Sequence, residues 1–503
     1  MTASARISQS ELEGYLWGAA VILRGLIDAG DYKGYIFPLI FLKRVSDVWD
    51  EEHRSALNAY GDEALADLPE NHRFVIPEGC HWGDIRSVTK DVGSKLRSAM
   101  GLIEAANPDS LDGVFGEGEW TNKDLLSDAT LVSLIEHFST KTLSIVNLPE
   151  DELGNGYEYL IKRFADDSGH TAQEFYTNRT LVHLMAQMLK PQPGESIYDP
   201  TCGTGGMLIS CAAEVKARGQ EHRALRLYGQ ERNFTTASIA KMNLFLHGIE
   251  DAHIAQADTL TDPRFLDDAG RLRRFDLVLA NPPYSISSWD RGAFTNDRFG
   301  RNIWGVPSQG RADYAFFQHI ASSMDSTTGR AAILFPHGVL FRQEEADMRA
   351  RLVQSGLLEA VIGLGPGLFY NSPMEAVVVV LRSTRPEPRR DTVLFINAVD
   401  LVGRERAQSF LLPQHQSEIL AAYEAYNTIP GRSRVASIDD IAANNYSLAI
   451  PLYVAVLEGI ASAPRIENVV DSWRIAATEA DLAIEELLGS FGPDSADAQE
   501  TRL

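Results

Sequence analysis

Apolar residues in the first third of the chain recur at every third or fourth position, which is the spacing of one face of an α-helix. Between Leu12 and Ile27 they occupy positions 12, 16, 17, 20, 23, 26 and 27. Residues 35–44 are apolar enough for a buried helix, and an acidic stretch follows at 47–52. We expect residues 8–148 to form a helical bundle that has no chemistry of its own and serves assembly or clamping.

From about residue 173 to residue 398, short β-rich runs alternate with helical segments. The clearest runs lie at 196–198, 225–229, 253–256, 275–280, 331–335, 360–363, 376–381 and 393–396. Alternating strands and helices predict a parallel, doubly wound, Rossmann-like α/β sheet whose ligands bind at the carboxyl ends of the strands.

The chain after about residue 413 is again helical in pattern. An apolar stripe at Leu482, Ile484, Leu487, Leu488 and Phe491 fits a core face and a docking helix equally well, and a polar tail starts at Pro493. We therefore expect three parts: an N-terminal helical domain (1–150), an α/β domain (151–412) and a C-terminal helical assembly region (413–503).

Composition restricts the class of protein. The chain of 503 residues is 44% hydrophobic and 23% charged, which is ordinary for a globular protein, and no apolar run is long enough to span a membrane. It contains three cysteines without metal-ligand spacing and no signal-peptide pattern, so we expect a cytoplasmic protein without a metal site. The formal net charge of −23 argues against unaided, non-specific binding of nucleic acid.

A glycine-rich loop follows the first predicted strand and opens a helix. Glycines there let the main chain turn tightly and approach a ligand, while the helix N-terminus offers unpaired N–H groups. On its own such a loop is more often a plain turn or a nucleotide site. The candidate cofactor residues of this loop are Asp199, Gly203, Thr204, Gly205 and Gly206.

Three neighbouring features favour a nucleoside cofactor that carries no phosphate. Glu231 ends the next strand, where a carboxylate can hold two ribose hydroxyls. Asp258 follows the third strand and can accept a hydrogen bond from an adenine amine, although a turn cap is the plain alternative. The upstream residues Phe175, Tyr176, Thr177, Asn178 and Arg179 offer aromatic, hydroxyl and cationic groups. S-adenosylmethionine is a cofactor of this kind.

The tetrapeptide Asn281-Pro282-Pro283-Tyr284 follows the buried run 275–280. An exocyclic ring amine is a poor nucleophile because its lone pair is delocalised. The side-chain oxygen of Asn281 and the main-chain carbonyl of Pro282 can accept its two hydrogens and direct the lone pair at a methyl donor. The prolines hold both acceptors in place, and Tyr284 can stack on a base rotated out of a duplex.

Methylation at carbon 5 of cytosine requires a cysteine nucleophile, and none lies near this tetrapeptide. The following residues, 285–311, include Arg291, Arg298, Arg301 and Arg311. They read equally well as a solvated loop and as a segment that closes over DNA and contacts phosphates. We expect this segment to be poorly ordered without DNA.

Together these residues resemble one known family, the modification subunits of type I restriction–modification systems, which are adenine-specific DNA methyltransferases. The resemblance covers most of the chain and is carried by residues 16–20, 35–37, 42–47, 175–177, 199–206, 230–231, 281–284 and 329–334. It implies that S-adenosylmethionine binds through 204–206, Glu231 and the segment from Glu174 to Arg179.

The resemblance also implies partners: duplex DNA, a specificity subunit that reads its sequence, flanked by two modification subunits, and a restriction subunit that cleaves. Asn178 stands where the family commonly has proline, which leaves the position of Arg179 open. Residues 365–367, Gly-Pro-Gly, also differ from the usual family sequence of a loop late in the chain.

Other functions are compatible with parts of the pattern. Asn-Pro-Pro-Tyr also serves enzymes that methylate a glutamine side chain or a ribosomal RNA base, and the cytosine amine poses the same geometric problem as the adenine amine. A non-catalytic cofactor-binding assembly subunit is a further alternative. The flanking helical regions, the arginine-bearing segment and the family marks favour adenine in DNA.

Overall fold

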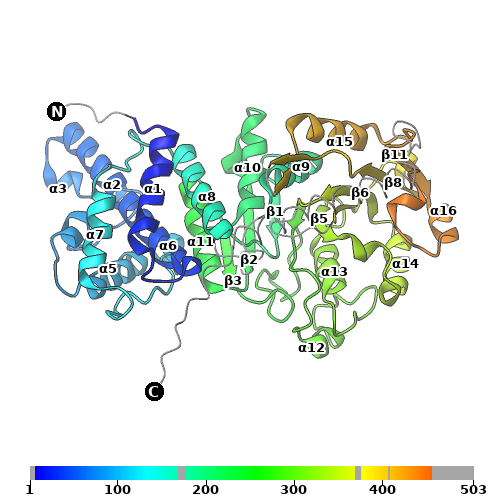
Figure 1. Ribbon diagram of the computed structural model, residues 1–503, viewed down its shortest axis with the longest axis horizontal. Coiled ribbons are helices and arrows are strands. Elements are labelled where there is room, and N and C mark those ends of the chain that lie inside the picture. Colours follow the sequence, from blue (N-terminus) through cyan, green and yellow to red (C-terminus); the bar gives the residue numbers. More distant parts are fainter. Residues whose placement is uncertain (1–5, 168–176, 369–374, 406–407, 456–503) are drawn as a thin grey trace, which may run out of the picture. The chain divides into compact units, whose positions relative to one another are not determined.

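The protein is described by a computed structural model that covers residues 6–167, 177–368, 375–405 and 408–455 (Figure 1). Met1–Val454 is one compact unit, and all the described helices and strands belong to it. The predicted site residues Glu174, Phe175 and Tyr176 and the apolar stripe at 482–491 lie outside the described residues.

The first part of the chain is the predicted helical bundle. Its described α-helices are α1 (Gln9–Leu23), α2 (Lys33–Tyr60), α3 (Glu63–Ala66), α4 (Trp82–Arg86), α5 (Val92–Ala106), α6 (Pro108–Leu111), α7 (Asp128–Ser139) and α8 (Glu150–Asp167). Ser8 and Glu11 form a capping box at the start of α1. The apolar faces of these helices meet in one core, and the run 35–44 lies buried inside α2, as the sequence predicts.

The second part is built on a sheet of nine strands. In spatial order they are β11 (Ser433–Ser437), β8 (Thr392–Ala398), β6 (Leu358–Pro366), β7 (Glu375–Arg382), β5 (Arg330–Pro336), β4 (Leu277–Ala280), β1 (Ser196–Asp199), β2 (Arg226–Glu231) and β3 (His253–Gln256). Residues 403–405 and 408–410 form a small separate hairpin, β9 and β10.

Helices cover both faces of this sheet (Figure 1). One face packs against α9 (Arg179–Leu189), α10 (Gly206–Ala217), α11 (Phe234–Leu246) and α15 (Pro413–Ala425). The other face packs against α13 (Asp313–Ser323), α14 (Ala346–Gln354) and α16 (Ile438–Ala443). The predicted doubly wound α/β fold is therefore confirmed.

The sheet is mixed, whereas the sequence analysis expected it to be parallel. β7 runs antiparallel to both β5 and β6, and β11 runs antiparallel to β8. Only residues 367–374 connect β6 to β7, and a parallel crossover needs a dozen or more residues. The candidate site lies on strands β1 to β5, and every pairing between two of these strands is parallel.

The region after residue 412 is not purely helical, because β11 forms the edge strand of the large sheet. α15 and α16 pack onto the two faces of the sheet, so residues 413–454 belong to the same folded unit as the sheet. The domain boundaries given above remain a prediction. None of the helices in the described ranges is both long and apolar enough to cross a membrane.

Candidate active site

The carboxyl ends of four adjacent parallel strands bring the predicted site residues together. The order β4-β1-β2-β3 places the ends of these strands side by side, and Asn281, Asp199, Glu231 and Asp258 lie at or just after those ends. The direction of winding reverses between β1 and β4. Such a switch point leaves a crevice beyond the strands, which is where doubly wound sheets bind their ligands.

The glycine loop after β1 is shaped by its own main chain. Gly203 and Gly205 have φ of +53° and +81°, in the left-handed region that favours glycine. The Cys202 N–H donates to the carbonyl of Gln230 over 3.0 Å, and the Asn243 side chain donates to the carbonyl of Thr204 over 2.8 Å. The loop is thus tied to β2 and to α11, and its glycines line the start of α10.

Glu231 stands rigidly at the end of β2. Its two carboxylate oxygens accept the N–H groups of Gly203, over 3.1 Å, and Asn233, over 2.8 Å. A carboxylate oxygen carries more than one lone pair, so the same oxygen can accept both a main-chain N–H and a ribose hydroxyl. Asp258 caps a turn by accepting the N–H groups of Leu260 and Thr261, so its structural role is present whether or not it also meets a ligand.

Asp199 is the most strongly buried carboxyl of this group, with 2% of its surface exposed. Burial raises the pKa of Asp199 to about 8, and the nearby charge of Glu231 acts in the same direction. The Thr201 N–H, which donates to Asp199 over 3.0 Å, partly opposes this by lowering the pKa. The carboxyl is therefore poised to change its charge when a cation or hydrogen-bond donor arrives.

The start of α9 lies directly over the glycine loop. Asn178, the departure from the family pattern, caps α9 by accepting the Thr180 N–H over 3.1 Å, and it donates to the Ser409 carbonyl over 3.0 Å. Arg179 is thereby fixed: its guanidinium occupies the space that a Cβ on Gly206 would fill, and it forms an ion pair with Glu158 of α8. The structure therefore places the Arg179 guanidinium beside the start of α10.

Thr177 and Asn281 connect the two predicted halves of the site. The Asn281 side-chain nitrogen donates to the Thr177 hydroxyl over 3.0 Å. The Asn281 side-chain oxygen accepts a hydrogen bond from the Tyr284 hydroxyl. Burial raises the pKa of Tyr284 well above its usual value, with the charge of Asp313 acting the same way, so the hydroxyl stays protonated and able to donate.

The cysteines in the described residues are not suited to act as nucleophiles. Cys202 and Cys211 are both buried, and burial raises the pKa of each thiol above its ordinary value. A thiol, unlike a thiolate, is a weak nucleophile. This environment is consistent with a methyl transfer that uses no cysteine nucleophile.

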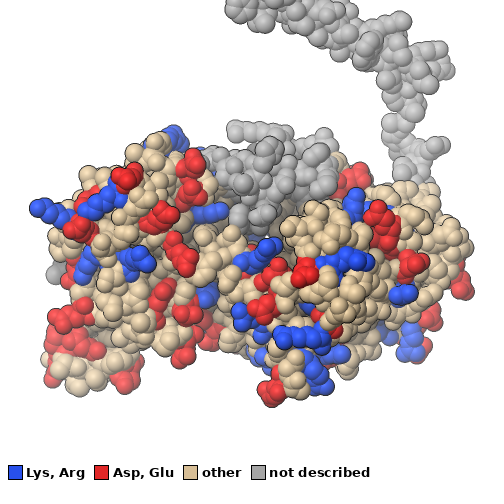
Figure 2. Space-filling model, turned by 90° about the horizontal axis from the view of Figure 1, so that it is seen from below, with Lys and Arg blue, Asp and Glu red and all other residues tan. Residues whose placement is uncertain are grey.

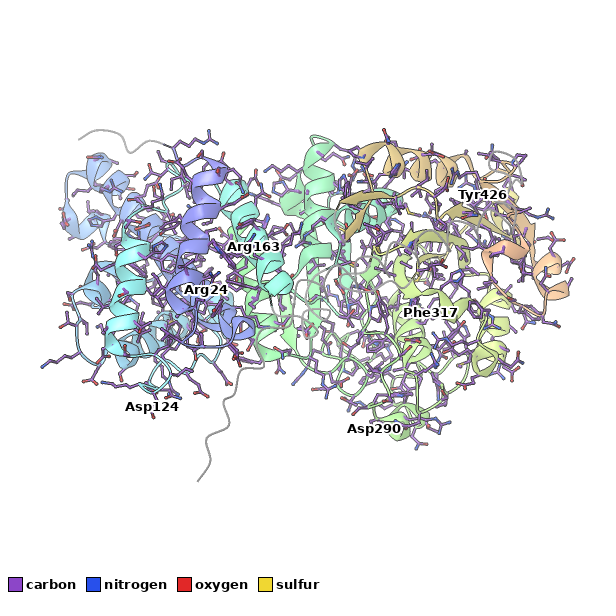
Figure 3. All side chains as sticks on the ribbon, in the orientation of Figure 1. Arg24, Asp124, Arg163, Asp290, Phe317 and Tyr426 are labelled. Atoms are coloured by element: carbon purple, nitrogen blue, oxygen red, sulfur yellow. The ribbon has the colours of Figure 1, made fainter. Side chains whose placement is uncertain are left out.

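The segment 285–311 is packed more firmly than the sequence analysis expected. It contains the short helix α12 (Arg291–Thr295), whose N-cap Asp290 lies on the rim away from the sheet in Figure 3. Arg301 is only 1% exposed: it donates to the carbonyls of Thr259 and Leu260 and pairs with Asp297 over 2.6 Å. Arg301 therefore anchors the segment and cannot contact phosphate, which excludes for this residue one of the two interpretations of the segment.

Figure 2 looks from below at the molecule of Figure 1, and it shows several Lys and Arg side chains, with Asp and Glu among them, toward the lower centre of that face. Among the described arginines of the segment 285–311, Arg291 and Arg298 are exposed, whereas Arg311 is half-buried.

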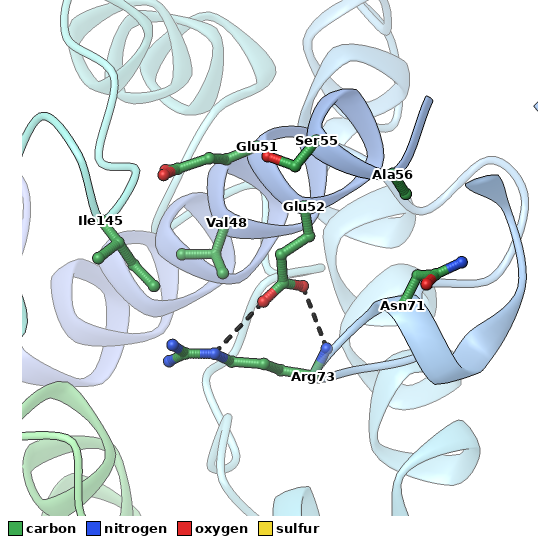
Figure 4. A pocket seen from close by; sticks show the side chains of 8 residues that line it. All are labelled: Val48, Glu51, Glu52, Ser55, Ala56, Asn71, Arg73 and Ile145. Atoms are coloured by element: carbon green, nitrogen blue, oxygen red, sulfur yellow. Dashed lines mark hydrogen bonds and ion pairs between the residues drawn. The ribbon is translucent and has the colours of Figure 1, made fainter. Parts of the chain in front are cut away.

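Several residues that shape the site were not predicted from the sequence. Asn243 holds the glycine loop, Glu158 holds Arg179, and Asp313 accepts the Ser285 N–H directly after the tetrapeptide. These residues lie far from the motifs along the chain, so no local pattern marks them. A pocket of about 340 Å³ lies elsewhere, against α2, where Glu52 pairs with Arg73 (Figure 4). None of the strand-end residues Asp199, Glu231, Asp258 and Asn281 lines it.

Comparison with known proteins decides the family. A family model described as N-6 DNA Methylase matches residues 149–459, and a model of the HsdM N-terminal domain matches residues 12–138. The chain belongs to the N-6 DNA methylase family. It transfers a methyl group from S-adenosylmethionine to the N6 amine of adenine in DNA, as the sequence predicts.

Relatives of this N-6 DNA methylase match it over most of its length. The Type I restriction enzyme MjaIX methylase subunit of Methanocaldococcus jannaschii is 27% identical, over 89% of this chain and 84% of the relative. The MpnII methylase subunit of Mycoplasma pneumoniae is 26% identical, over 88% and 89%. The crystal structure of a type I restriction-modification methyltransferase subunit from Streptococcus thermophilus superposes with a TM-score of 0.78 at 28% identity, covering 89% of this chain and 100% of the other.

The described residues of this N-6 DNA methylase fit S-adenosylmethionine. Gly203 and Gly205 let the main chain approach a ligand, and Glu231, whose carboxylate could accept ribose hydroxyls, contacts the same loop through the Gly203 N–H. Asp199 offers a buried carboxyl beside the same loop. When bound, the cofactor supplies an activated methyl group carried on a sulfonium.

Proposed function

We propose that this chain methylates adenine through Asn281 and Pro282, with Tyr284 stacking on the base rotated into the site. The observation that carries this proposal is the hydrogen bond from Asn281 to Thr177. It commits the amide nitrogen of Asn281 to the cofactor-side segment and so leaves the amide oxygen as the acceptor that faces away from it.

The target amine takes the place of the Tyr284 hydroxyl. In this structure that hydroxyl donates to Asn281 at the position where an amine hydrogen would donate. When a base enters, the Tyr284 ring leaves this contact and lies against the base, while the Pro282 carbonyl accepts the second amine hydrogen. Holding both hydrogens withdraws the lone pair from the ring system and directs it along the line of transfer.

The cofactor residues of this proposal are those of the sequence analysis. Glu231 binds the ribose hydroxyls, Asp258 receives the adenine amine of the cofactor, and the loop 203–206 with Asp199 surrounds its amino-acid end. Thr177, Asn178 and Arg179 cover the loop, supported by the contacts of Arg179 with Gly206 and Glu158. Glu174, Phe175 and Tyr176 complete the set in the proposal.

We expect the working form to be a complex. The net charge of −23 favours shared rather than solitary DNA binding. A specificity subunit that reads the sequence, bound by two copies of this chain, and a restriction subunit that joins to cleave are the partners proposed from the family. Co-expression with a specificity subunit, followed by mass measurement of the purified complex, tests the stoichiometry: one copy of this chain per specificity subunit would contradict it.

The test of the function is transfer of labelled methyl groups. The chain, alone and with its specificity subunit, is incubated with labelled S-adenosylmethionine and unmethylated genomic DNA, and the nucleosides are separated. Label is expected in N6-methyladenine; label in N4-methylcytosine, in RNA or in protein would overturn the proposal.

The variant Asn281→Ala should reduce transfer about 100- to 1000-fold, because one of the two preorganised acceptors is lost. Cofactor binding, measured by calorimetry, should change by less than about threefold, because Asn281 meets the amine rather than the cofactor. Turnover equal to that of the unaltered chain would disprove the catalytic role.

A further inference from the structure

Asp313 lies behind the Asn-Pro-Pro-Tyr tetrapeptide, at the first position of α13. Its side chain is completely buried, with 0% exposed. One carboxylate oxygen accepts the N–H of Ser285 over 2.8 Å. The other pairs with the guanidinium of Arg342 over 2.7 Å. Both oxygens of a buried charge are thus engaged, one on the active-site main chain and one on a cation.

The Ser285 main chain needs such support. Ser285 has φ of +50°, in the left-handed region where a residue other than glycine is strained by about 1–2 kcal/mol. This turn begins where the tetrapeptide ends. β4 fixes the chain before Asn281 through its pairing with β1 and β5, and the Asp313 hydrogen bond fixes it after Tyr284. The tetrapeptide is therefore held at both ends.

Arg342 is itself held in a fixed position. A Cβ on Gly338 would lie 2.8 Å from its Nε, so the guanidinium stem packs closely against the main chain after β5. Its second nitrogen lies 3.4 Å from the carboxylate of Glu345, which is 2% exposed. Burial raises the pKa of Glu345 to about 7, while Arg342 lowers it. Asp313, Arg342 and Glu345 form one buried charged cluster beside the tetrapeptide.

We infer that Asp313, oriented by Arg342, is a positioning residue that holds the chain after Tyr284 so that Asn281 and Pro282 present both acceptors to the target amine. Asp313 touches neither base nor cofactor, and it acts through the Ser285 N–H. The inference rests on the proposed function, because it explains how the acceptors of that reaction are kept in place.

The test uses the full chain in complex with its specificity subunit and compares two variants. Asp313→Ala removes the acceptor of the Ser285 N–H, and a small displacement of reacting groups lowers kcat about 100-fold. Asp313→Asn keeps an oxygen for that N–H while losing the charge paired with Arg342, so its kcat should lie between those of Asp313→Ala and the unaltered chain. The KM for cofactor should stay within roughly threefold in both.

Glu195→Gln is the matched control. Glu195 forms a two-pronged ion pair with Arg330, over 2.9 and 2.8 Å, at the amino ends of the strands and therefore at the edge remote from the tetrapeptide. If the Asp313 effect came only from lost stability, Glu195→Gln would lower kcat to the same degree at equal loss of melting temperature. That result, or a rise in KM with kcat unchanged, would overturn the inference.

A second measurement separates this inference from the proposed function. Hydrogen–deuterium exchange of the peptide that contains Ser285 reports the Asp313 contact whether or not methyl transfer occurs. Exchange should be faster in Asp313→Ala than in the unaltered chain and intermediate or unchanged in Asp313→Asn, which can fold even if the alanine variant does not. Unaltered exchange in Asp313→Ala would refute the positioning role of Asp313, whereas an unaltered chain that methylates only RNA or protein would refute the proposed function alone.

Discussion

At the scale of single residues, the side chains of the site are oriented by hydrogen bonds made within the protein. The Asn281 amide nitrogen donates to Thr177 and its oxygen accepts from Tyr284, while the two Glu231 oxygens accept the N–H groups of Gly203 and Asn233. A side chain that is already held in place loses little conformational entropy when a ligand binds to it. The site is in this sense prepared before substrate arrives.

The pKa of Asp199 leads to a prediction about stability. The folded-state pKa is about 8, well above the ordinary value of 3.8. Between these two values the folded protein keeps a proton that the unfolded chain has lost. The free energy of unfolding of the cofactor-free protein should therefore fall as pH rises through this window, by up to about 1.4 kcal/mol per pH unit from this group.

The variant Asp199→Asn isolates that contribution, because an amide does not ionise and other titrating groups are common to both proteins. Calorimetric melting temperatures are compared without cofactor from about pH 5 to about pH 9. The unaltered protein should lose stability relative to the variant as pH rises, and the difference should level off above about pH 8. A difference that does not depend on pH would mean that Asp199 is ionised in the folded state.

At the scale of elements, the sequence predicts the existence of most strands but not all of their directions. The run 253–256 coincides with β3, because its alternation and flanking turns are local signals. β7 was expected to be parallel; its antiparallel direction follows from the short connection to β6. β11 was missed because Ser433, Arg434 and Ser437 make it polar, as suits an edge strand.

The site likewise contains residues that the local sequence marks and residues that only the packing of distant elements brings in. Asp199, Glu231 and Asn281 were predictable because each directly follows an apolar strand, and strand ends gather at one edge of the sheet. Asp313 and Glu158 were not predictable, because only the packing of α13 and α8 brings them to that edge. The burial of Arg301 was missed for a similar reason: its partners Thr259 and Leu260 lie about forty residues away, in another loop.

The junction of α9 with α10 gives a prediction for an element. In Gly206→Ala the new Cβ would lie 1.6 Å from the Arg179 guanidinium, so that flexible side chain must move away from the glycine loop and from Glu158. Alanine is the better helix former, so melting temperature should change little. Cofactor affinity, measured by calorimetry, should fall about tenfold, as expected for the loss of one charged contact.

Gly101→Ala provides the comparison. Gly101 lies within α5, and a Cβ there would have no atom within 4 Å. This variant should gain up to about 1 kcal/mol of stability and bind cofactor as the unaltered chain does. Equal cofactor affinity in Gly206→Ala and Gly101→Ala would exclude a role for the Arg179 position in cofactor binding.

At the scale of the whole described unit, α11 joins the helical bundle to the sheet. Its Ala237, Ala240 and Leu244 pack in the core of the sheet, whereas Ile239, Met242 and Leu246 pack in the core of the bundle. A helix that is apolar on both sides must be buried on both sides. Figure 1 shows α11 between α8 and β2, and the contacts of α11 with α8 and α2 agree with that view.

Charged contacts reinforce the same junction. Arg73, beside the pocket of Figure 4, pairs with Glu52 of α2, with Glu150 of α8 and with Glu250 just after α11. The main chain of α8 also approaches the residue after α11 closely at Gly154, because a Cβ there would lie 2.7 Å from the ring of His247. Bundle and sheet are therefore joined by apolar packing, ion pairs and close main-chain approach.

This junction predicts that the α/β part does not fold stably by itself. A fragment that starts at residue 168 would expose Ile239, Met242 and Leu246, and burial of each such side chain contributes about 1.5–3 kcal/mol. Their sum is comparable to the whole stability of a typical domain, about 5–15 kcal/mol. The fragment should be insoluble, or should melt well below the full chain, as measured by sedimentation and calorimetry.

Two further experiments test whether the exposed apolar face of α11, rather than truncation in general, makes the fragment insoluble. Co-expression of residues 1–167 as a separate chain should restore solubility, because it covers the same apolar face of α11. In a second fragment, Ile239→Gln, Met242→Gln and Leu246→Gln should also restore solubility without any added chain, since the exposed surface is then polar. A fragment that is soluble with its native α11 and melts at the temperature of the full chain would show that the bundle and the sheet are energetically independent, and that the helical region contributes nothing to the stability of the catalytic fold.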